Sequence, residues 1–312
     1  MAAVESVEQL RERLLSGTAD VATRMRTVFA LKGLGSDEAV HVLGSALLRE
    51  TSALVAHEIC YVLGQMKLES AMPVLTETLK DTQRDAMVRH EAAEALGAIG
   101  APHAAEILAQ FEHDAEVVVA ETCQVALERI RWLNSPQRAA FDLEYGQYRS
   151  VDPAPAIKLR DSDGALKTQA CSVEELRRIL MDGAESLFTR YTAMFSLRNM
   201  HSEESIKVLC DALHDPSALF RHEIAFVLGQ MADARSVPAL KAVLLDVNEH
   251  AMVRHEAAEA LGAIASDECD ALLHEFRHDP SAVVRESCLV ALDISEYNNS
   301  DQMHYTDRIV NA

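Results

Sequence analysis

The stretch MVRHEAAEALGAI occurs twice in this chain, at Met87–Ile99 and again at Met252–Ile264, with all thirteen residues identical. A second pair has the same offset of 165 residues: ALVAHEICYVLGQM at Ala53–Met66 and ALFRHEIAFVLGQM at Ala218–Met231 agree at ten of fourteen positions. Near the start of each half, SVEQL at 6–10 corresponds to SVEEL at 172–176. Repetition on this scale indicates a duplicated chain whose two halves share one fold.

A finer repeat lies within each half. A unit similar to V-R-x-E-A-A-x-A-L-G recurs every 30 to 33 residues, and its apolar residues follow the helical period, as Val88, Ala92 and Leu96 do. A second amphipathic segment follows each unit, for example at 70–81. The pattern predicts an all-α solenoid of eight HEAT-like helical hairpins, four in each half. The glycine of the unit, a common signal at helix C-termini, is predicted to end its helix; it stands at Gly33, Gly64, Gly97, Gly229 and Gly262.

The region between the halves has a different composition. Its proline and glycine residues, among them Pro136, Pro153 and Gly164, favour a linker with little regular structure. We therefore predict an N-terminal repeat half at 1–133, a linker at 134–171 and a C-terminal repeat half at 172–312. The run FDLEYGQY at Phe141–Tyr148 concentrates aromatic residues that are scarce elsewhere, and we expect it either to pack on one half or to form a short strand or helix. The polar tail beyond Tyr297 is expected to fray.

Composition limits the classes of partner and the cellular compartments that suit this chain. The chain has 312 residues and a net charge of −20, which disfavours nucleic acid and anionic membrane surfaces and favours a cationic partner, although solubility alone can explain such a charge. No apolar run approaches the ~20 residues of a membrane span, and the first fifteen residues lack the apolar core of a signal peptide. The six cysteines contain no CxxC pair and lie in apolar helical patterns. These features predict a cytoplasmic protein with reduced thiols.

Histidine enters the repeat at four positions only. His57, His90, His222 and His255 each precede a glutamate and each stand seven residues before the unit's glycine. These are the two inner units of each half, and the outer units carry Arg26, Thr192, Ala120 and Arg285 at that position. A histidine that served only packing would recur in every unit, so this restriction predicts a central site. The glutamate alone also occurs without histidine, at Glu121 and Glu286, where we expect a structural role such as a salt bridge between repeats.

The ligand set favours a metal. Equivalent positions on stacked helices lie ~10 Å apart, so His57 can converge with His90, and His222 with His255. Because no cysteine accompanies them, a thiolate zinc site is disfavoured. Two histidines with one carboxylate are typical of non-haem iron, and the doubled set suggests two metals; dinuclear hydrolases use the same residue types, so hydrolysis stays open. The alternative is four salt-bridged or capped histidines.

The four His-Glu pairs, with HEI-x-x-VLGQM followed by VRHEAAEALGAI in each half, resemble the deoxyhypusine hydroxylase family over nearly the whole chain. The resemblance implies a cytoplasmic di-iron monooxygenase that consumes molecular oxygen and hydroxylates the deoxyhypusine side chain of the translation factor 5A precursor. It implies no catalytic residue beyond the metal centre. Two roles are carried over: iron ligands at His57, His90, Glu91, His222, His255 and Glu256, and substrate-amine binding at Glu58 and Glu223, whose additional contact with metal stays open.

Residue chemistry agrees with these roles. The deoxyhypusine side chain is a long aliphatic arm with two amines, and Glu58 and Glu223 could hold such cations by charge-assisted hydrogen bonds. A non-catalytic HEAT scaffold that binds a basic protein partner is the alternative. A repeat protein like the phycobilin lyases is a third interpretation, but it gives no reason for four paired histidines.

Overall fold

The computed structural model describes residues 5–136, 148–156 and 171–300, and in these residues it contains helices and no strands. The first half contains α1 (Val7–Leu15), α2 (Val21–Leu34), α3 (Asp37–Leu47), α4 (Ala53–Met66), α5 (Met72–Lys80), α6 (Ala86–Ile99), α7 (Ala104–Leu108) and α8 (Val117–Leu133). The second contains α10 (Val173–Met181), α11 (Leu187–Met200), α12 (Glu203–Ala212), α13 (Ala218–Met231), α14 (Val237–Leu245), α15 (Ala251–Ile264), α16 (Asp267–Phe276) and α17 (Ala282–Asn298).

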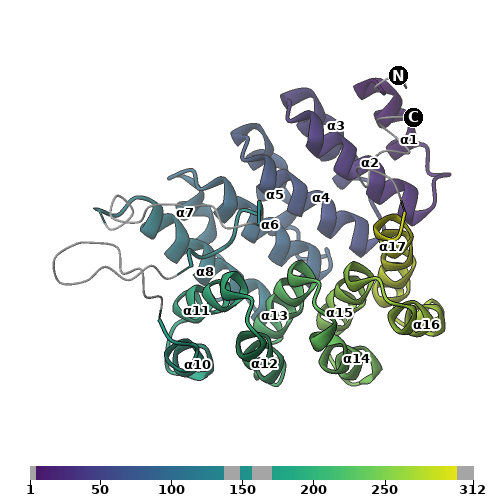
Figure 1. Ribbon diagram of the computed structural model, residues 1–312. Coiled ribbons are helices and arrows are strands. Elements are labelled where there is room, and N and C mark those ends of the chain that lie inside the picture. Colours follow the sequence, from purple (N-terminus) through teal and green to yellow (C-terminus); the bar gives the residue numbers. More distant parts are fainter. Residues whose placement is uncertain (1–4, 137–147, 157–170, 301–312) are drawn as a thin grey trace.

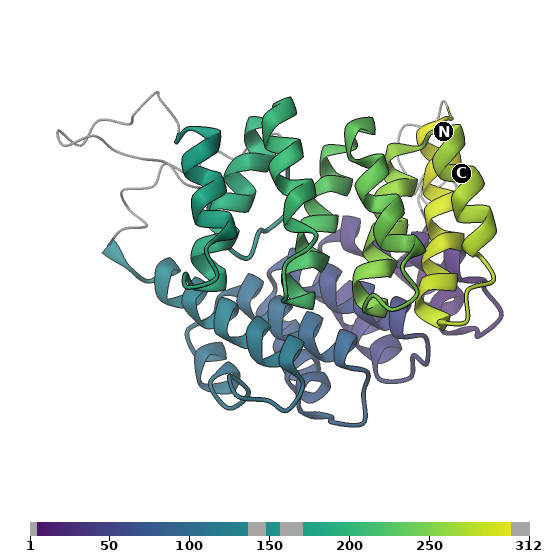
Figure 2. The ribbon, with the colours of Figure 1, turned by 90° about the horizontal axis from the view of Figure 1, so that it is seen from below.

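Consecutive helices pair as hairpins, from α1 with α2 to α16 with α17, and the hairpins stack side by side (Figure 1). This confirms the predicted all-α HEAT-repeat solenoid. The helices α2, α4, α6 and α8 form the inner face of the first row, and α11, α13, α15 and α17 form the inner face of the second. The two rows face each other in opposite order, so α17 contacts α2 and α8 contacts α11 (Figure 2). The inner helices of both halves are therefore brought together at the centre.

The repeat glycines do not end their helices, so that prediction was wrong. Gly64 and its counterpart Gly229 lie two residues before the ends of α4 and α13, and the left-handed residues that follow these helices are Lys67 and Ala232. A Cβ on Gly64 would lie only 2.7 Å from the Cα of Ala95 in α6. Close approach of neighbouring inner helices, rather than chain reversal, is what requires glycine here.

Polar contacts join the two rows. The guanidinium of Arg26 in α2 pairs with both carboxylate oxygens of Asp293 in α17, at 2.7 and 2.5 Å. Ser217, the N-cap of α13, donates its hydroxyl to Glu121 at 2.7 Å, and Ser52, the N-cap of α4, donates to Glu286. Glu121 and Glu286 are therefore structural, as expected, but each binds a serine of the opposite half rather than a cation of a neighbouring repeat.

Part of the predicted linker is described. Helix α8 ends at Leu133, α10 begins at Val173, and residues 148–156 contain neither helix nor strand. The aromatic run, except for Tyr148, and the tail beyond Ser300 lie outside the described residues.

The cysteines and the lengths of the helices bear on the environment that the sequence predicted. All six cysteines are free, and five of them are buried, while Cys210 is half-buried. No helix in the described parts of the chain combines the length and the apolar character that crossing a bilayer requires. Buried free thiols agree with the absence of a disulfide framework that the sequence predicted.

Candidate metal centre

Four inner helices carry the four histidines at the same position along their length. Each of α4, α6, α13 and α15 has fourteen residues, and the histidine is the fifth residue of each. Serine caps begin α4 and α13, while Asp85 and His250 cap α6 and α15 through their side chains. Because the caps and lengths match, the two pseudo-symmetric pairs of helices present their histidines at the same level between the rows.

The imidazoles form a single cluster across the two halves. The ring of His57 lies 5.5 Å from His90, 5.3 Å from His255 and 5.9 Å from His222, measured between centroids. His222 lies 5.4 Å from His90 and 5.3 Å from His255. All four are buried, and His90 and His255 are fully so. The structure thus brings all four predicted histidines together, and the contacts between halves are as short as those within a half.

The four predicted glutamates accompany the histidines. Glu91 Oε2 lies 3.2 Å from His57 Nε2, and in the second half Glu256 Oε2 lies 3.4 Å from His222 Nε2. Glu58 Oε1 lies 3.1 Å from His57 Nδ1. Glu223 is buried, and its Oε1 has no hydrogen-bond partner. The eight side chains therefore make one compact acidic and imidazole centre with the pseudo-symmetry of the chain.

A cavity of about 180 Å³ opens onto this centre, and its lining includes two carboxylates that the sequence reasoning missed. Glu94 and Glu259 lie one helical turn beyond His90 and His255, and the same positions in the other two helices hold Tyr61 and Phe226. The sequence shows this pattern, since the fourth residue after each histidine is aromatic in the second repeat of each half and acidic in the third. The cavity is lined by Phe29, His57, Glu58, Tyr61, Glu91, Glu94, His222, Glu223, Phe226, Glu256 and Glu259.

Burial and mutual repulsion shift the pKa values of the centre. Burial, reinforced by the neighbouring imidazoles, holds the pKa of His90 and His255 well below the usual range. Burial also acts to lower the pKa of His57, but Glu91 and Glu58 outweigh it and the pKa is raised. Burial and nearby carboxylates raise the pKa values of Glu94, Glu223 and Glu259 well above that of an ordinary glutamate. The lowered pKa keeps His90 and His255 neutral, which is the form of imidazole that binds a metal. The crowding of carboxylates that raises the pKa of the three glutamates is a charge density that a bound cation would offset.

The donor atoms of the centre fit a metal. Both ring nitrogens of His90, Nδ1 of His222 and Nε2 of His255 are buried without a hydrogen-bond partner, whereas most buried polar atoms in proteins have one. Donors of His222, His255 and Glu256 lie within 4.8 Å of one another, as the second-half ligand set requires. The first-half donors are divided between two such groups, His57–His90–His222 and His90–Glu91–Glu94.

Surrounding residues fix the orientation of the centre. Ser287 of α17 places its hydroxyl 3.5 Å from His255 Nδ1 and donates to Glu259 at 3.2 Å. Arg254, the residue before His255, donates to the Leu244 carbonyl and pairs with Asp279, and Arg89 has the same role before His90. Supports of this kind hold ligands in place around metal sites.

Comparison with known proteins agrees with this geometry. A HEAT-repeat family model matches residues 7–86, 41–128 and 206–293, and a model of the phycobilisome-lyase HEAT-like repeat matches 189–215 alone. Deoxyhypusine hydroxylase from Danio rerio is 47% identical over 298 residues, covering 95% of this chain and 94% of that protein. The enzyme from Drosophila melanogaster is 45% identical over 307 residues, covering 98% and 97%. The chain belongs to the deoxyhypusine hydroxylase family.

A solved structure supports the same conclusion. Human deoxyhypusine hydroxylase, in complex with glycerol, matches with a TM-score of 0.86 at 45% identity, covering 93% of this chain and 96% of that one. The chain is therefore an enzyme of this family, and the alternative of a non-catalytic scaffold is not supported.

Proposed function

We propose that this chain is a cytoplasmic di-iron monooxygenase that uses molecular oxygen to hydroxylate the deoxyhypusine side chain of the translation factor 5A precursor. The observation that carries the proposal is the buried quartet of histidines beside carboxylates, in a chain of this family, with both ring nitrogens of His90 lacking a hydrogen-bond partner. Hydroxylase chemistry needs an oxygen-activating group, and histidine with carboxylate is the donor set that iron oxygenases use.

The ligands proposed for the two irons are His57, His90 and Glu91 from the first half and His222, His255 and Glu256 from the second. Iron held there would supply the activation of oxygen. The protein's own part is to bring three donors from each half to one place, since His57 lies as close to His255 as to its own neighbour His90. The mixed grouping of first-half donors also makes Glu94 a further candidate ligand.

The cavity suits an aliphatic arm that carries amines. Phe29, Tyr61 and Phe226 supply aromatic walls for the methylene groups, and the ring centroids of Tyr61 and Phe226 lie 6.1 Å apart. Glu58 and Glu223 are placed to accept hydrogen bonds from ammonium groups, and the partnerless Oε1 of Glu223 is a ready acceptor. Burial of the site keeps water from competing for these contacts.

The two halves act as two arms of one site in this proposal. Residues 1–133 and 172–312 each provide two histidine-bearing helices, and residues 134–171 join them. The partner is the precursor protein that carries the arm, and neither nucleic acid nor a membrane is a proposed partner. The charge of −20 suits a cationic side chain as substrate.

Metal content provides the first test. The purified protein should hold about two irons per chain, and His57→Ala and His255→Ala should each lose iron together with the gain of one oxygen atom on the substrate, read by mass spectrometry. His274→Ala is the matched control, because His274 also precedes a glutamate but does not line the central cavity. Protein that holds no metal, or holds only zinc, would refute the proposal.

The roles of Glu58 and Glu223 need a separate measurement. Glu58→Gln and Glu223→Gln should raise KM for the substrate protein while iron content stays close to that of the unaltered protein. Loss of iron in either variant would instead identify that glutamate as a ligand.

A further inference from the structure

The pseudo-symmetry of the centre is broken beside the cavity. Helices α2 and α11 occupy equivalent places in the two halves, and their matching positions hold Phe29 with Lys32 in the first half and Phe195 with Arg198 in the second. Each pair therefore offers an aromatic ring and a cation. Phe29 lines the cavity, whereas Phe195 is fully buried and does not. The two sides of the centre thus differ in access although their helices correspond.

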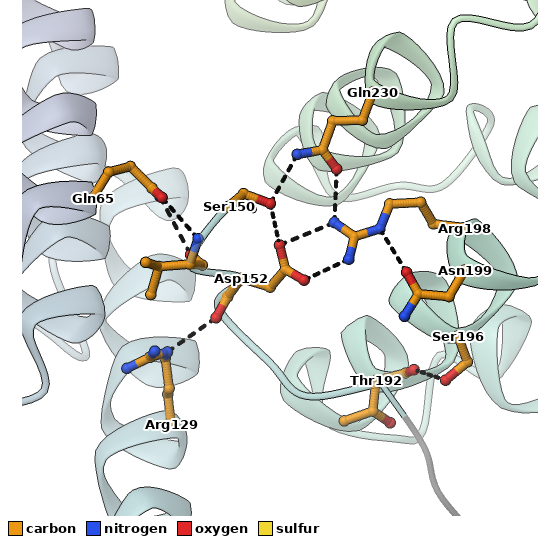
Figure 3. A network of polar contacts seen from close by, with 10 residues as sticks. Gln65, Arg129, Ser150, Asp152, Thr192, Ser196, Arg198, Asn199 and Gln230 are labelled. Carbon is orange, nitrogen blue, oxygen red and sulfur yellow. Dashed lines mark hydrogen bonds and ion pairs between the residues drawn. The ribbon is translucent and has the colours of Figure 1, made fainter. Parts of the chain in front are cut away.

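A segment between the halves covers the second-half side. Within residues 148–156, which we call the strap, Asp152 pairs with the Arg198 guanidinium at 3.0 and 2.6 Å (Figure 3). The same guanidinium lies 4.4 Å from the ring of Tyr148 and 4.8 Å from that of Phe195. Arg129 of α8 donates to the Asp152 carbonyl at 3.0 Å. The Arg198 guanidinium is therefore held by the strap together with Gln230 and Asn199.

Contacts with the site helices place the strap over the cavity wall. Gln65 accepts from the Val151 amide at 2.7 Å, and Gln230 donates to Ser150 at 3.0 Å. Gln65 and Gln230 lie one turn beyond the cavity residues Tyr61 and Phe226 on α4 and α13. The strap thus contacts both rows, one helical turn beyond these two cavity residues (Figure 3).

The space beneath the strap is small. Pro153 lines a void of only about 10 Å³ together with Glu94, Arg129 and Tyr191. A void of this volume is about one water in size. This void between Pro153 and Glu94 is therefore too small for an aliphatic arm.

The first-half side has a different character. The Lys32 ammonium lies 5.3 Å from the centroid of the Tyr61 ring and 5.7 Å from that of Phe29. Burial lowers the pKa of Lys32, and the negative charge of Glu58 opposes that shift. A primary ammonium over two aromatic rings, within the field of Glu58, is the arrangement that an incoming amine would also need. Among the described residues, the strap has no counterpart on this side.

We propose that the strap makes the duplicated centre one-sided, so that the substrate arm enters only past Phe29, Lys32 and Tyr61. The leading ammonium passes over the two rings toward Glu58, and the second-half mouth stays closed by the Asp152–Arg198 pair. This inference rests on the proposed function. It assigns Lys32 and Asp152 as positioning residues that give an otherwise two-fold site a single direction of substrate entry.

Reversible labelling of one thiol on each side tests the route. Lys32→Cys places a thiol at the proposed entrance, and Arg149→Cys places one on the exposed part of the strap. Five native cysteines are buried, and burial raises the pKa of the half-buried Cys210 to about 11, so the background reaction with a bulky methanethiosulfonate is small. Each labelled protein is compared with its own unlabelled form.

Labelling Lys32→Cys should lower kcat/KM for the substrate protein about tenfold or more, with iron content unchanged and with recovery after thiol reduction. The same label on Arg149→Cys should change kcat/KM by less than about twofold. Equal losses at both positions, or a larger loss at Arg149→Cys, would overturn the proposal.

A second readout does not depend on turnover. 1,4-Diaminobutane should slow the labelling of Lys32→Cys and leave that of Arg149→Cys unchanged. Protection of neither position, or of the strap position alone, refutes the entry route. If iron-loaded, unlabelled protein fails to hydroxylate its substrate while the diamine still protects Lys32→Cys, the proposed function fails and the entry route stands.

Discussion

Replacing Gly64 by alanine should destabilise the protein through one interhelical contact. The new Cβ would lie 2.7 Å from Cα and 2.9 Å from Cβ of Ala95, whereas ordinary contacts begin at 3.4 Å. Helices α4 and α6 must therefore move apart by about 1 Å, and overpacking of this kind costs about 1–3 kcal/mol. Alanine returns about 1 kcal/mol through its helix propensity. The net loss in the free energy of unfolding should be up to about 2 kcal/mol.

The chain contains a matched control at the same repeat position. Gly33 also lies inside its helix, but a Cβ there would meet nothing within 4 Å. Gly33→Ala should therefore stabilise the protein by up to about 1 kcal/mol. Gly229→Ala, with its nearest contacts at 3.0 Å, should fall between the two, and Gly262→Ala, with 2.5 Å to the Ala291 carbonyl oxygen, should be the most damaging.

Urea unfolding of the iron-free variants, followed by circular dichroism, measures this order. The midpoint should shift while the m-value stays constant, since the exposed surface on unfolding is unchanged. The same separation of helices would move His57 away from His90, so Gly64→Ala should also hold the proposed iron less tightly than Gly33→Ala. Equal stability of Gly64→Ala and Gly33→Ala would refute the view that close packing, and not chain reversal, selects these glycines.

Three further predictions concern contacts away from the cavity. Arg26→Ala should lower the free energy of unfolding by about 3 kcal/mol, measured by chemical denaturation, because it removes the buried Arg26–Asp293 ion pair between the rows. The hydrogen bond from Arg89 lowers the pKa of Asp114. The stability that the Asp114 carboxylate contributes is therefore complete above its ordinary pKa of 3.8 and is lost as the pH falls through the lowered pKa. Asp114→Asn should make the free energy of unfolding less dependent on pH in this acidic range. In the native protein a thiol reagent should react slowly with the half-buried Cys210 and not with the five buried cysteines, since burial raises the pKa of Cys123 and Cys288, for example, to about 12. All six thiols should react once the protein is unfolded.

The sequence predicted the solenoid and the four histidines because both depend on local periodicity. A histidine confined to the inner repeats of both halves leaves few arrangements other than a shared centre. The same reasoning failed for the glycines, since glycine suits both a helix end and a close helix contact, and only the tertiary structure distinguishes them. Four left-handed helix ends are formed by Lys67, His201, Ala232 and Ala265, which carry no glycine signal.

Glu94 and Glu259 escaped notice for a related reason. Within the repeat they look like solvent-facing glutamates of an amphipathic helix, and only the opposing row turns that face into a cavity wall. The contacts of the strap could not be predicted from the sequence either, because proline and glycine predict an irregular segment and do not specify which residues it contacts. Its contacts with Gln65 and Arg198 depend on the two halves being side by side.

The last repeat of each half supports the opposite half instead of carrying a histidine. Glu121 in α8 and Glu286 in α17 accept hydrogen bonds from Ser217 and Ser52, the caps of the opposite half's histidine-bearing helices α13 and α4. The last repeat of each half therefore holds in place the helix that carries the other half's histidine. Since His57 contacts His222 and His255 across the same interface, one half alone would expose two imidazoles to water instead of enclosing a metal. Metal binding and the pairing of the halves should accordingly be coupled, because each stabilises the arrangement that the other requires.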